Sequence, residues 1–338
     1  MLIEANNRMF GHGWRGAIPP QYIFAKRRFR GIALNPPRFE PGSWIGAGKV
    51  IVDYDAEEFW MTARPRNIEQ RGYAVEFYRS PNGEDFKLMS TLEKDDAAAM
   101  ANVKIDSIEG TQILRDPLTE KYYLYVSADV GQRQWETLLF MADDPQGPWT
   151  FHSVTLKRDK DYDASEARDA SISIIDGNYV ALYKANPSAD DVRAMNLNVA
   201  FATSSDGIRW TKHGVLKIAG KPTPPYIFLS GSIFASASGP LFMGFENLDK
   251  IHGAHVTRKF ASYVIDQRDM ELIPVFESIW TPLSPYERKD WPAHGYMDLA
   301  YDPFKNRVLM YIEAIDPNYG EVGLNLEVDR LLVYETRL

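Results

Sequence analysis

The sequence predicts an all-β fold, a five-bladed β-propeller with blades of about four antiparallel strands around an axial funnel. Three observations predict it. A unit of apolar strand, polar turn and second apolar strand recurs about five times, the copies are evenly spaced, and no segment shows sustained helical periodicity. Residues 112–116 with 121–129, and 172–176 with 178–186, show the unit clearly. Strand-rich repeats at this spacing are typical of propeller blades.

The elements follow in order along the chain. Residues 1–43 are irregular and rich in Gly, Pro and Arg, with apolar patches at 22–24 and 32–34 that are candidate strands. One of these patches is expected to join the last blade and close the ring, which removes a free sheet edge. A helical turn or two is expected near residues 95–100. We expect a single domain over 1–338, and its five blades are placed at residues 44–90, 105–156, 166–218, 226–276 and 292–337.

Composition excludes several classes of protein. Hydrophobic residues make up 45% of the 338 residues, which is enough for a full core. The net charge of -8 argues against nucleic-acid binding, and the absence of cysteine excludes disulfides and thiolate metal sites. No apolar stretch approaches the length of a membrane span. The first residues do not resemble a secretory signal, so a cytoplasmic location is expected, although a secreted protein whose signal has been removed looks the same. The sequence carries no signal for an oligomeric state.

The turns between outer strands carry a resemblance to a known group. Residues 204–210 read Ser-Ser-Asp-Gly-Ile-Arg-Trp, and residues 144–149 read Asp-Pro-Gln-Gly-Pro-Trp. Both resemble blade turns of the five-bladed propeller glycosidases, the relatives of glycoside hydrolase families 43, 32 and 130. The resemblance covers residues 44–337 and implies a carbohydrate substrate.

A sharper motif lies at residues 108–113, Ile-Glu-Gly-Thr-Gln-Ile. It resembles the Glu-Gly-Pro-x-apolar segment of family 43, in which the glutamate is the general acid, and this implies that role for Glu109. Thr111 stands where that family has proline. Residues 46–49 read Gly-Ala-Gly-Lys where the family places an aspartate base. The Glu-Asp-Pro-Arg motif of the family 130 phosphorylases fits less well, because Gly110 and Gln112 stand at its Asp and Arg.

Strand geometry predicts which residues face the funnel. The first strand of a blade starts on the funnel face, and the antiparallel second strand ends there. Aligning the second and third blades on Asp116 and Asp176 places Glu109 and Asp169 at equivalent first-strand starts. Glu246 follows an apolar strand and is a third catalytic candidate. The predicted substrate-binding residues at or near such strand ends are Arg64, Arg66, Lys184, Asn186, His294, Asp298 and Glu313.

These residue types suit glycosidic bond cleavage. That reaction uses two carboxyl groups, one as proton donor and one as base or nucleophile. The donor needs a raised pKa, from burial or from a neighbouring carboxylate. We expect Glu109 to be the donor and Asp169 to be the base or the group that sets the pKa of the donor. The basic residues are expected to hold hydroxyls, a sugar carboxylate or phosphate. No metal or cofactor is expected.

Three functions remain open at this point. The first is a glycoside hydrolase, with inversion expected because most of the resembled families invert. The second is an inverting glycoside phosphorylase, in which inorganic phosphate replaces water and basic residues lie beside the carboxylates. The third is a non-catalytic carbohydrate-binding propeller, which predicts an aromatic funnel without convergent carboxylates.

Overall fold

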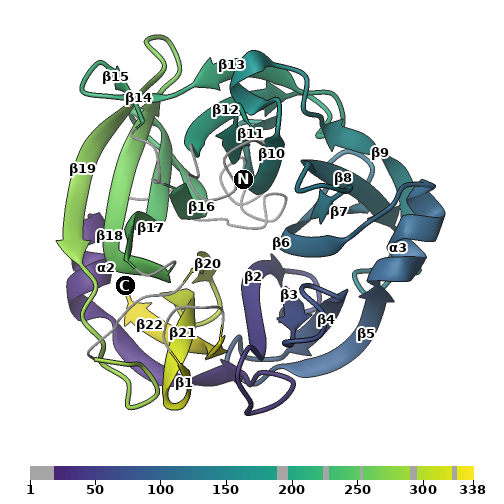
Figure 1. Cartoon of the computed structure of the whole chain (residues 1–338). Coiled ribbons are helices and arrows are strands. Elements are labelled where there is room, and N and C mark those ends of the chain that lie inside the picture. The colour runs from purple at the N-terminus through teal and green to yellow at the C-terminus, as the bar shows by residue number, and fades with distance from the viewer. Residues whose placement is uncertain (1–18, 189–196, 224–227, 252–253, 290–294, 322–325) are drawn as a thin grey trace.

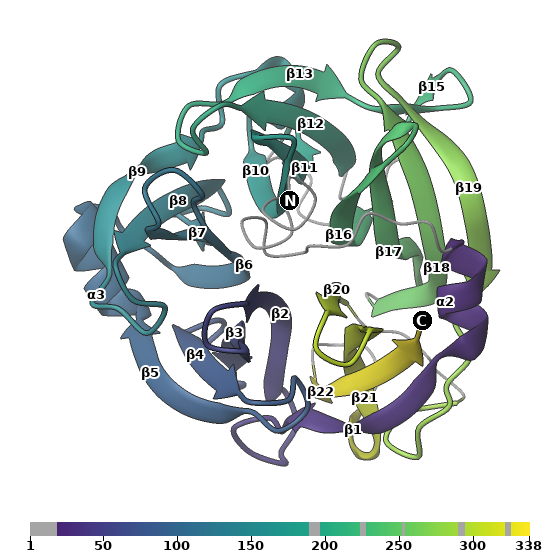
Figure 2. The ribbon, with the colours of Figure 1, turned by 180° about the vertical axis from the view of Figure 1, so that it is seen from behind.

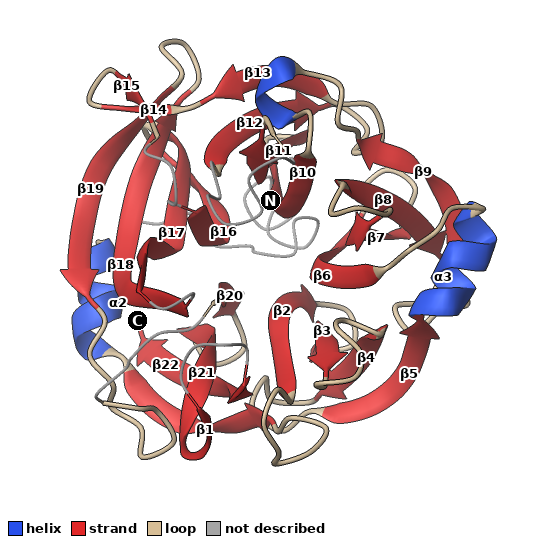
Figure 3. Ribbon diagram, viewed as in Figure 1, coloured by secondary structure: helices blue, strands red, loops and turns tan. Residues whose placement is uncertain are grey.

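The described chain is built of β-strands, which confirms the predicted all-β class. A computed structural model describes residues 19–188, 197–223, 228–251, 254–289, 295–321 and 326–338. Within these ranges, two short α-helices and one 3-10 turn accompany the strands (Figure 3). No helix in the described ranges is long and apolar enough to span a bilayer.

The strands form five antiparallel units of four, arranged around a common centre (Figures 1 and 2), and single parallel residue pairs join unit one to unit five and unit two to unit three, which gives three sheets. Unit one contains β2 (Trp44–Asp53), β3 (Glu58–Arg66), β4 (Ala74–Ser80) and β5 (Lys87–Glu93). Unit two contains β6 (Ser107–Arg115), β7 (Tyr122–Asp129), β8 (Trp135–Ala142) and β9 (Thr150–Leu156). Unit three contains β10 (Glu166–Ile175), β11 (Asn178–Asn186), β12 (Asn198–Ser204) and β13 (Thr211–Val215), preceded by the 3-10 turn η1 (Asp161–Asp163). Unit four contains β16 (Phe228–Ser236), β17 (Gly239–Ile251), β18 (Ala254–Asp266) and β19 (Glu271–Ile279). Unit five contains β20 (Met297–Asp302), β21 (Arg307–Glu321), β22 (Leu326–Arg337) and β1 (Arg28–Leu34).

Strand β1 comes from the opposite end of the chain to its partner. It pairs antiparallel with β22, and Arg28 lies opposite Glu335. The outer edge of β22 is therefore covered by a strand made roughly 300 residues earlier in the sequence. Two further short strands, β14 (Lys217–Ile218) and β15 (Lys221–Pro222), extend unit four, because β14 pairs with β19. Residues 217–218, placed in the third blade from sequence, thus belong to this sheet.

The patch at residues 22–24 is a helix, so its assignment as a candidate strand is wrong. It lies in α2 (Pro20–Lys26), which starts with a proline in its first turn, a position where proline favours helix initiation. Phe24 packs with Phe260 and Trp280, so the helix buries its apolar face against unit four. The helical turn expected near 95–100 is confirmed as α3 (Lys94–Ala101), which lies on the outside of the ring (Figure 1).

The hydrophobic core lies between neighbouring units. One cluster packs side chains of units one, two and three, including Phe77, Leu124 and Ile172. Further clusters join units four and five, five and one, and three and four. Each unit therefore buries both faces of its inner strands, such as β3, β7 and β11, whereas outer strands such as β5, β9 and β19 keep exposed residues. Polar side chains of the inner strands gather at the strand ends.

The first strands of units one, two and three share one irregularity. In each, the register shifts by one extra residue: between Gly46 and Lys49 in β2, Ile108 and Thr111 in β6, and Arg168 and Ser171 in β10. Such β-bulges bend a strand and re-aim side chains, and they are frequent beside active sites. They lie at the starts of these strands, on the face predicted to carry the chemistry.

Candidate active site

Glu109 and Asp169 lie in matching bulges and share one partner. Glu109 belongs to the bulge of β6 and Asp169 to the bulge of β10. The Nη1 atom of Arg168 donates to the Glu109 carboxylate and, at 3.0 Å, to Asp169 Oδ2. Arg71, from the loop between β3 and β4, donates to the other oxygen of Glu109. The structure therefore brings the two predicted carboxylates together.

Asp169 is held by groups from three units. Lys184 Nζ donates to its Oδ2 at 2.6 Å, and the Tyr296 hydroxyl donates to the same oxygen at 2.7 Å. The backbone N–H of Gly110 donates to Oδ1 at 2.9 Å, an approach that glycine permits because a Cβ there would lie 2.7 Å from this oxygen. Asp169 itself has a φ of 50°, in the left-handed region that costs energy for a residue with a side chain. Strain of this kind persists where surrounding contacts fix the residue.

Both carboxylates are ionised in this arrangement. Burial alone raises the pKa of Glu109, but Arg168 and Arg71 outweigh it and hold the pKa at about 2. For Asp169, burial is again outweighed, here by Lys184 and Arg168, and its pKa is also lowered. Burial and the two carboxylates raise the pKa of Tyr296, so the phenol keeps its proton and donates it. A proton donor needs a raised pKa, whereas the pKa of Glu109 is lowered. The donor role of Glu109 therefore stays a prediction, and it requires that Arg71 or Arg168 move away from the carboxylate.

Arg64 and Arg66 lie at the end of β3, close to this cluster. They are 3% and 9% exposed, and neither makes a hydrogen bond or ion pair with any residue in the described ranges. The guanidinium of Arg66 lies over the Trp44 ring, 3.9 Å from its centroid, and that of Arg64 lies 6.0 Å from the same centroid. Burial, followed by the charges of Arg64 and Arg71, lowers the pKa of Arg66 to about 10.

Two other predicted residues adjoin the cluster. Asn186 donates to Glu166 Oε1 at 3.2 Å, and Glu166 in turn accepts from Arg168 Nε. Asn186 thus positions the cluster indirectly. Glu313 is fully buried and accepts the Tyr296 N–H at 3.2 Å. Its carboxylate fills the space beside Gly46, where a Cβ would overlap it.

Asp298 and Glu246 do not join the carboxylate cluster. Asp298 has no exposed surface, and it accepts from Lys49 Nζ at 3.1 Å, the Ser232 hydroxyl at 2.6 Å and the Val50 N–H at 2.8 Å. Its oxygens are bonded inside the protein, in an ion pair with Lys49, and its expected role in substrate binding stays a prediction.

Glu246 accepts a hydrogen bond from the Tyr263 hydroxyl within its own unit. Burial raises its pKa, against the effects of Tyr263 and Lys259. Its neighbours are thus on unit four, not on the units that carry Glu109 and Asp169. His294, the remaining predicted residue, lies outside the described residues.

Sequence reasoning missed three members of the cluster. Arg71 lies in a loop, Arg168 precedes a predicted acid on the same strand, and Tyr296 precedes β20 in unit five. Arg168 could have been predicted, because it directly precedes the candidate Asp169 in the sequence. Arg71 and Tyr296 reach the carboxylates from other units, so their contacts depend on how the units pack and leave no local pattern.

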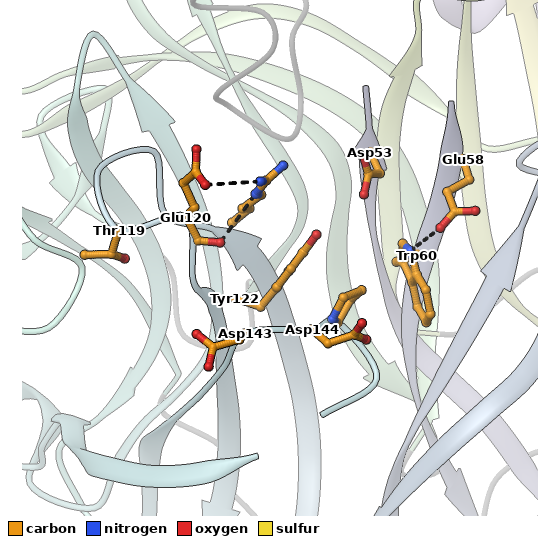
Figure 4. Close-up of a pocket in the computed structure, with 10 residues that line it drawn as sticks. Asp53, Glu58, Trp60, Thr119, Glu120, Tyr122, Asp143 and Asp144 are labelled. Carbon is orange, nitrogen blue, oxygen red and sulfur yellow. Dashed lines mark hydrogen bonds and ion pairs between the residues drawn. The ribbon is translucent and has the colours of Figure 1, made fainter. Parts of the chain in front are cut away.

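A charged pocket of about 410 Å³ lies at the opposite ends of the same strands (Figure 4). It is acidic, and Figure 4 shows Glu58 facing the Trp60 indole, whose N–H donates to it at 2.9 Å. Arg115, at its wall, is six residues from Glu109 along β6, or about 20 Å at the usual rise of a strand. The pocket is thus separate from the carboxylate cluster. Across the described ranges, no group of three or more His, Cys, Asp or Glu side chains is arranged to hold a metal ion.

Solved structures with a similar fold include glycoside hydrolases. No family model and no curated protein matches the chain. Among solved structures, a thermostable family-43 glycoside hydrolase aligns with a TM-score of 0.62 at 12% identity, over 86% of this chain and 88% of that chain. The chain resembles the propeller glycosidases.

Two other families of these enzymes give similar scores. A family 117 glycoside hydrolase from Zobellia galactanivorans gives a TM-score of 0.60 at 12% identity, over 93% of this chain and 91% of that one. The family 32 β-fructofuranosidase of Bombyx mori gives 0.62 at 11% identity, over 94% of this chain and 65% of that one. At these identities the likeness to the propeller glycosidases concerns the fold, so an activity has to be argued from the site.

Proposed function

We propose that this chain is a glycosidase, folded as a single five-bladed propeller, that cleaves a carbohydrate where Glu109 and Asp169 meet. The observation that carries the proposal is the placement of these two carboxylates in matching bulges of adjacent units, bridged by one nitrogen of Arg168. Paired carboxyl groups are what glycosidic bond cleavage requires. The likeness to propeller glycosidases supports the same class of reaction.

The two carboxylates take different roles in this proposal. Because one nitrogen bonds both, their facing oxygens lie within two hydrogen-bond lengths, roughly 6 Å. That leaves no room for an attacking water between them. Both oxygens of Asp169 are also bonded within the protein, by Lys184, Tyr296 and the Gly110 N–H, so in this proposal Asp169 orients Glu109 and tunes its pKa. Glu109 donates the proton once substrate displaces Arg71, whose side chain is 43% exposed. Loss of that cation and closer burial both raise the pKa of Glu109.

Inversion needs a second carboxylate farther from the donor, at about 6.5–9.5 Å, to activate water. We assign this base to Glu313. Its carboxylate lies against Gly46 at the bulge of unit one, the third copy of the position that carries Glu109 and Asp169. Tyr296 links the groups, since its N–H bonds Glu313 and its hydroxyl bonds Asp169.

Phosphorolysis is the second candidate, and one observation favours it. Arg64 and Arg66 are buried cations without acceptors in the described ranges, beside the carboxylates. Inorganic phosphate would be held by such a pair, and it would then replace water as the attacking group.

The test measures cleavage of a panel of aryl glycosides and oligosaccharides, with and without phosphate. Compared with the wild type, Glu109→Gln is expected to lower kcat/KM by about 10²–10⁴-fold on a substrate whose leaving group needs a proton. The matched control is Glu120→Gln, at an exposed wall of the opposite pocket. In Glu313→Gln, added azide should restore turnover and give an inverted glycosyl azide.

The outcomes separate the functions. Cleavage in plain buffer that depends on Glu109 supports the hydrolase, and cleavage that requires phosphate supports the phosphorylase. Equal activity of Glu109→Gln and wild type contradicts the site. Carbohydrate binding without cleavage by the wild type would identify a binding propeller instead.

A further inference from the structure

The two arginines at the end of β3 form a pair with a shared orientation. Arg64 and Arg66 are two residues apart on one strand, so their side chains leave the same face of the sheet. They lie opposite Gly46 and Trp44 of β2. We call Arg64 and Arg66 the arginine pair.

The arginine pair lacks the partners that buried guanidinium groups normally have. Both Nε atoms are buried without a hydrogen-bond acceptor, and no described residue forms an ion pair with either side chain. Buried charges in proteins are usually paired, because an unpaired one loses its hydration without compensation. Here two like charges lie near each other, and Arg71 adds a third.

The nearby carboxylates do not satisfy the pair. Glu109 and Asp329 act on Arg66 through space, yet neither forms an ion pair with it. Glu109 already accepts from Arg71 and from Arg168. Burial is the main cause of the lowered pKa of Arg66, about 10, and the charges of Arg64 and Arg71 lower it further.

Arg258 is a second buried arginine of the molecule, and burial lowers its pKa to about 10, as it does for Arg66. It is equally buried, and its Nε and Nη2 atoms also lack hydrogen-bond acceptors in the described ranges. Its charged neighbours, however, are Glu287, Glu313 and Asp329, all of them acids. Arg66 has the cations Arg64 and Arg71 among its nearest charges, beside the acids Glu109 and Asp329, so it differs from Arg258 in the like charges that an added anion would offset.

Trp44 holds the pair in place. The indole lies under the guanidinium of Arg66, and its own N–H is anchored by the Glu327 carbonyl at 2.6 Å. A guanidinium stacked on an aromatic face keeps its in-plane N–H groups free for an acceptor with two oxygens. The geometry is thus prepared before any ligand arrives.

We propose that the arginine pair is a subsite for an oxyanion, and that the ligand it takes is the carboxylate of an acidic sugar. The inference rests on the proposed function for its choice of a sugar, and the subsite would orient that sugar with its bond at Glu109. Inorganic phosphate presents the same chemistry to two guanidinium groups. The two sources are therefore separate arms of one experiment.

The experiment measures binding by titration calorimetry, so it does not depend on turnover. The probes are glucuronate, galacturonate and inorganic phosphate, with glucose and galactose as neutral counterparts. Wild type is expected to bind one of the anions and to bind the neutral sugars more weakly. Arg64→Gln and Arg66→Gln should each weaken that binding by about 10–100-fold, the usual effect of losing a hydrogen bond to a charged group. Arg79→Gln is the control, because Arg79 is an exposed arginine paired with Glu58.

A second readout separates binding from folding. In buffer without the anion, Arg66→Gln is expected to raise the melting temperature or leave it unchanged, since it removes an unpaired buried charge. Added anion should raise the melting temperature of the wild type and not that of the variant. A large loss of stability in the variant without anion would assign the pair a structural role and overturn the proposal.

Each outcome decides something. Uronate binding that depends on both arginines supports an acidic sugar, and phosphate binding alone supports the subsite while moving its occupant to free phosphate. Failure of all three anions to bind, or binding unchanged by both substitutions, overturns the subsite. If Glu109→Gln still binds the anion while no protein cleaves any glycoside, the proposed function fails and the subsite stands.

Discussion

The bulge of unit one and the bulges of units two and three have the same register shift but contain different side chains. In units two and three the inserted residues bring Glu109 and Asp169, and cations converge on them. In unit one the inserted residues are Ala47 and Gly48, which carry no charge. The space beside Gly46 is taken by Glu313 from unit five instead.

The residue that closes the bulge of unit one also has a different task. Lys49 is in a buried ion pair with Asp298, which joins units one and five. The same irregularity thus carries a proposed catalytic carboxylate of its own at two positions, and at the third it carries an assembly ion pair and adjoins Glu313 of unit five. A repeated backbone feature gives the place for a site, and the side chains within it decide whether the site is chemical or structural.

The largest expected effect comes from removing the ion pair between Lys49 and Asp298, the structural contact of unit one. Lys49→Met leaves Asp298 buried without its cation, which should lower the free energy of unfolding by about 3–5 kcal/mol, measured by urea unfolding. Lys87→Met, at an exposed position of β5, is the control. The double variant Lys49→Met with Asp298→Asn should recover part of the loss. Normal stability with lost activity would place the ion pair in the active site.

A smaller effect is expected from filling the space that Glu313 occupies. The Cβ of Gly46→Ala would overlap the Glu313 carboxylate, and overpacking of this kind costs about 1–3 kcal/mol. Gly31→Ala, where a Cβ meets no atom within 4 Å, is the matched control. Thermal unfolding of both variants is the measurement, and equal melting temperatures would show that Glu313 moves away freely.

The ion pairs of Glu109 in unit two can be tested through the dependence of stability on acidic pH. The pKa of Glu109 is about 2 in the folded chain, below its ordinary 4.5. A depressed pKa contributes stability above pH 4.5, and this contribution is lost as the pH falls from about 4.5 toward 2. Wild type should therefore lose stability more steeply in this window than Glu109→Gln, measured by urea unfolding at each pH. Parallel curves would contradict the ion pairs with Arg71 and Arg168.

The smallest expected effect concerns one cation. Arg71→Met removes a positive charge from Glu109, so the pKa of Glu109 should rise from about 2. If Glu109 donates a proton, the alkaline limb of the kcat/KM profile should move to higher pH. Arg79→Met serves as the control for loss of an exposed arginine. A limb that stays in place would separate Glu109 from proton donation.

The fold class could be predicted from the sequence because the signals that indicate a strand are local. Apolar runs such as 122–126 and the turns beside them mark strands in any context, and the all-β class follows. The pairing of Glu109 with Asp169 could also be predicted from sequence. Each strand contains a bulge of one extra residue, so aligning the strands on Asp116 and Asp176 still places the two carboxylates at equivalent positions.

The rest of the site depends on information that a single strand does not hold. The expectation that residues at strand ends face the funnel applies equally to Asp298 and Lys184. In the structure, Asp298 contacts Lys49 at the boundary with unit one, whereas Lys184 contacts Asp169. Helix α2 was assigned as a strand because three apolar residues fit either period. Arg71 and Tyr296 reach the carboxylates only after separate units have packed together.

The pairing of β1 with β22 imposes an order in time. Strand β1 is synthesised before the first four units, and its partner β22 is synthesised after them. During synthesis β1 has no edge to join, and the first four units have to form while the ring is incomplete. Since Tyr296 of unit five bonds Asp169 of unit three, the carboxylate cluster is complete only after unit five has begun to be made. A ribosome stalled before residue 296 would therefore hold a chain in which Glu109 has both arginine partners and Asp169 lacks one of its donors.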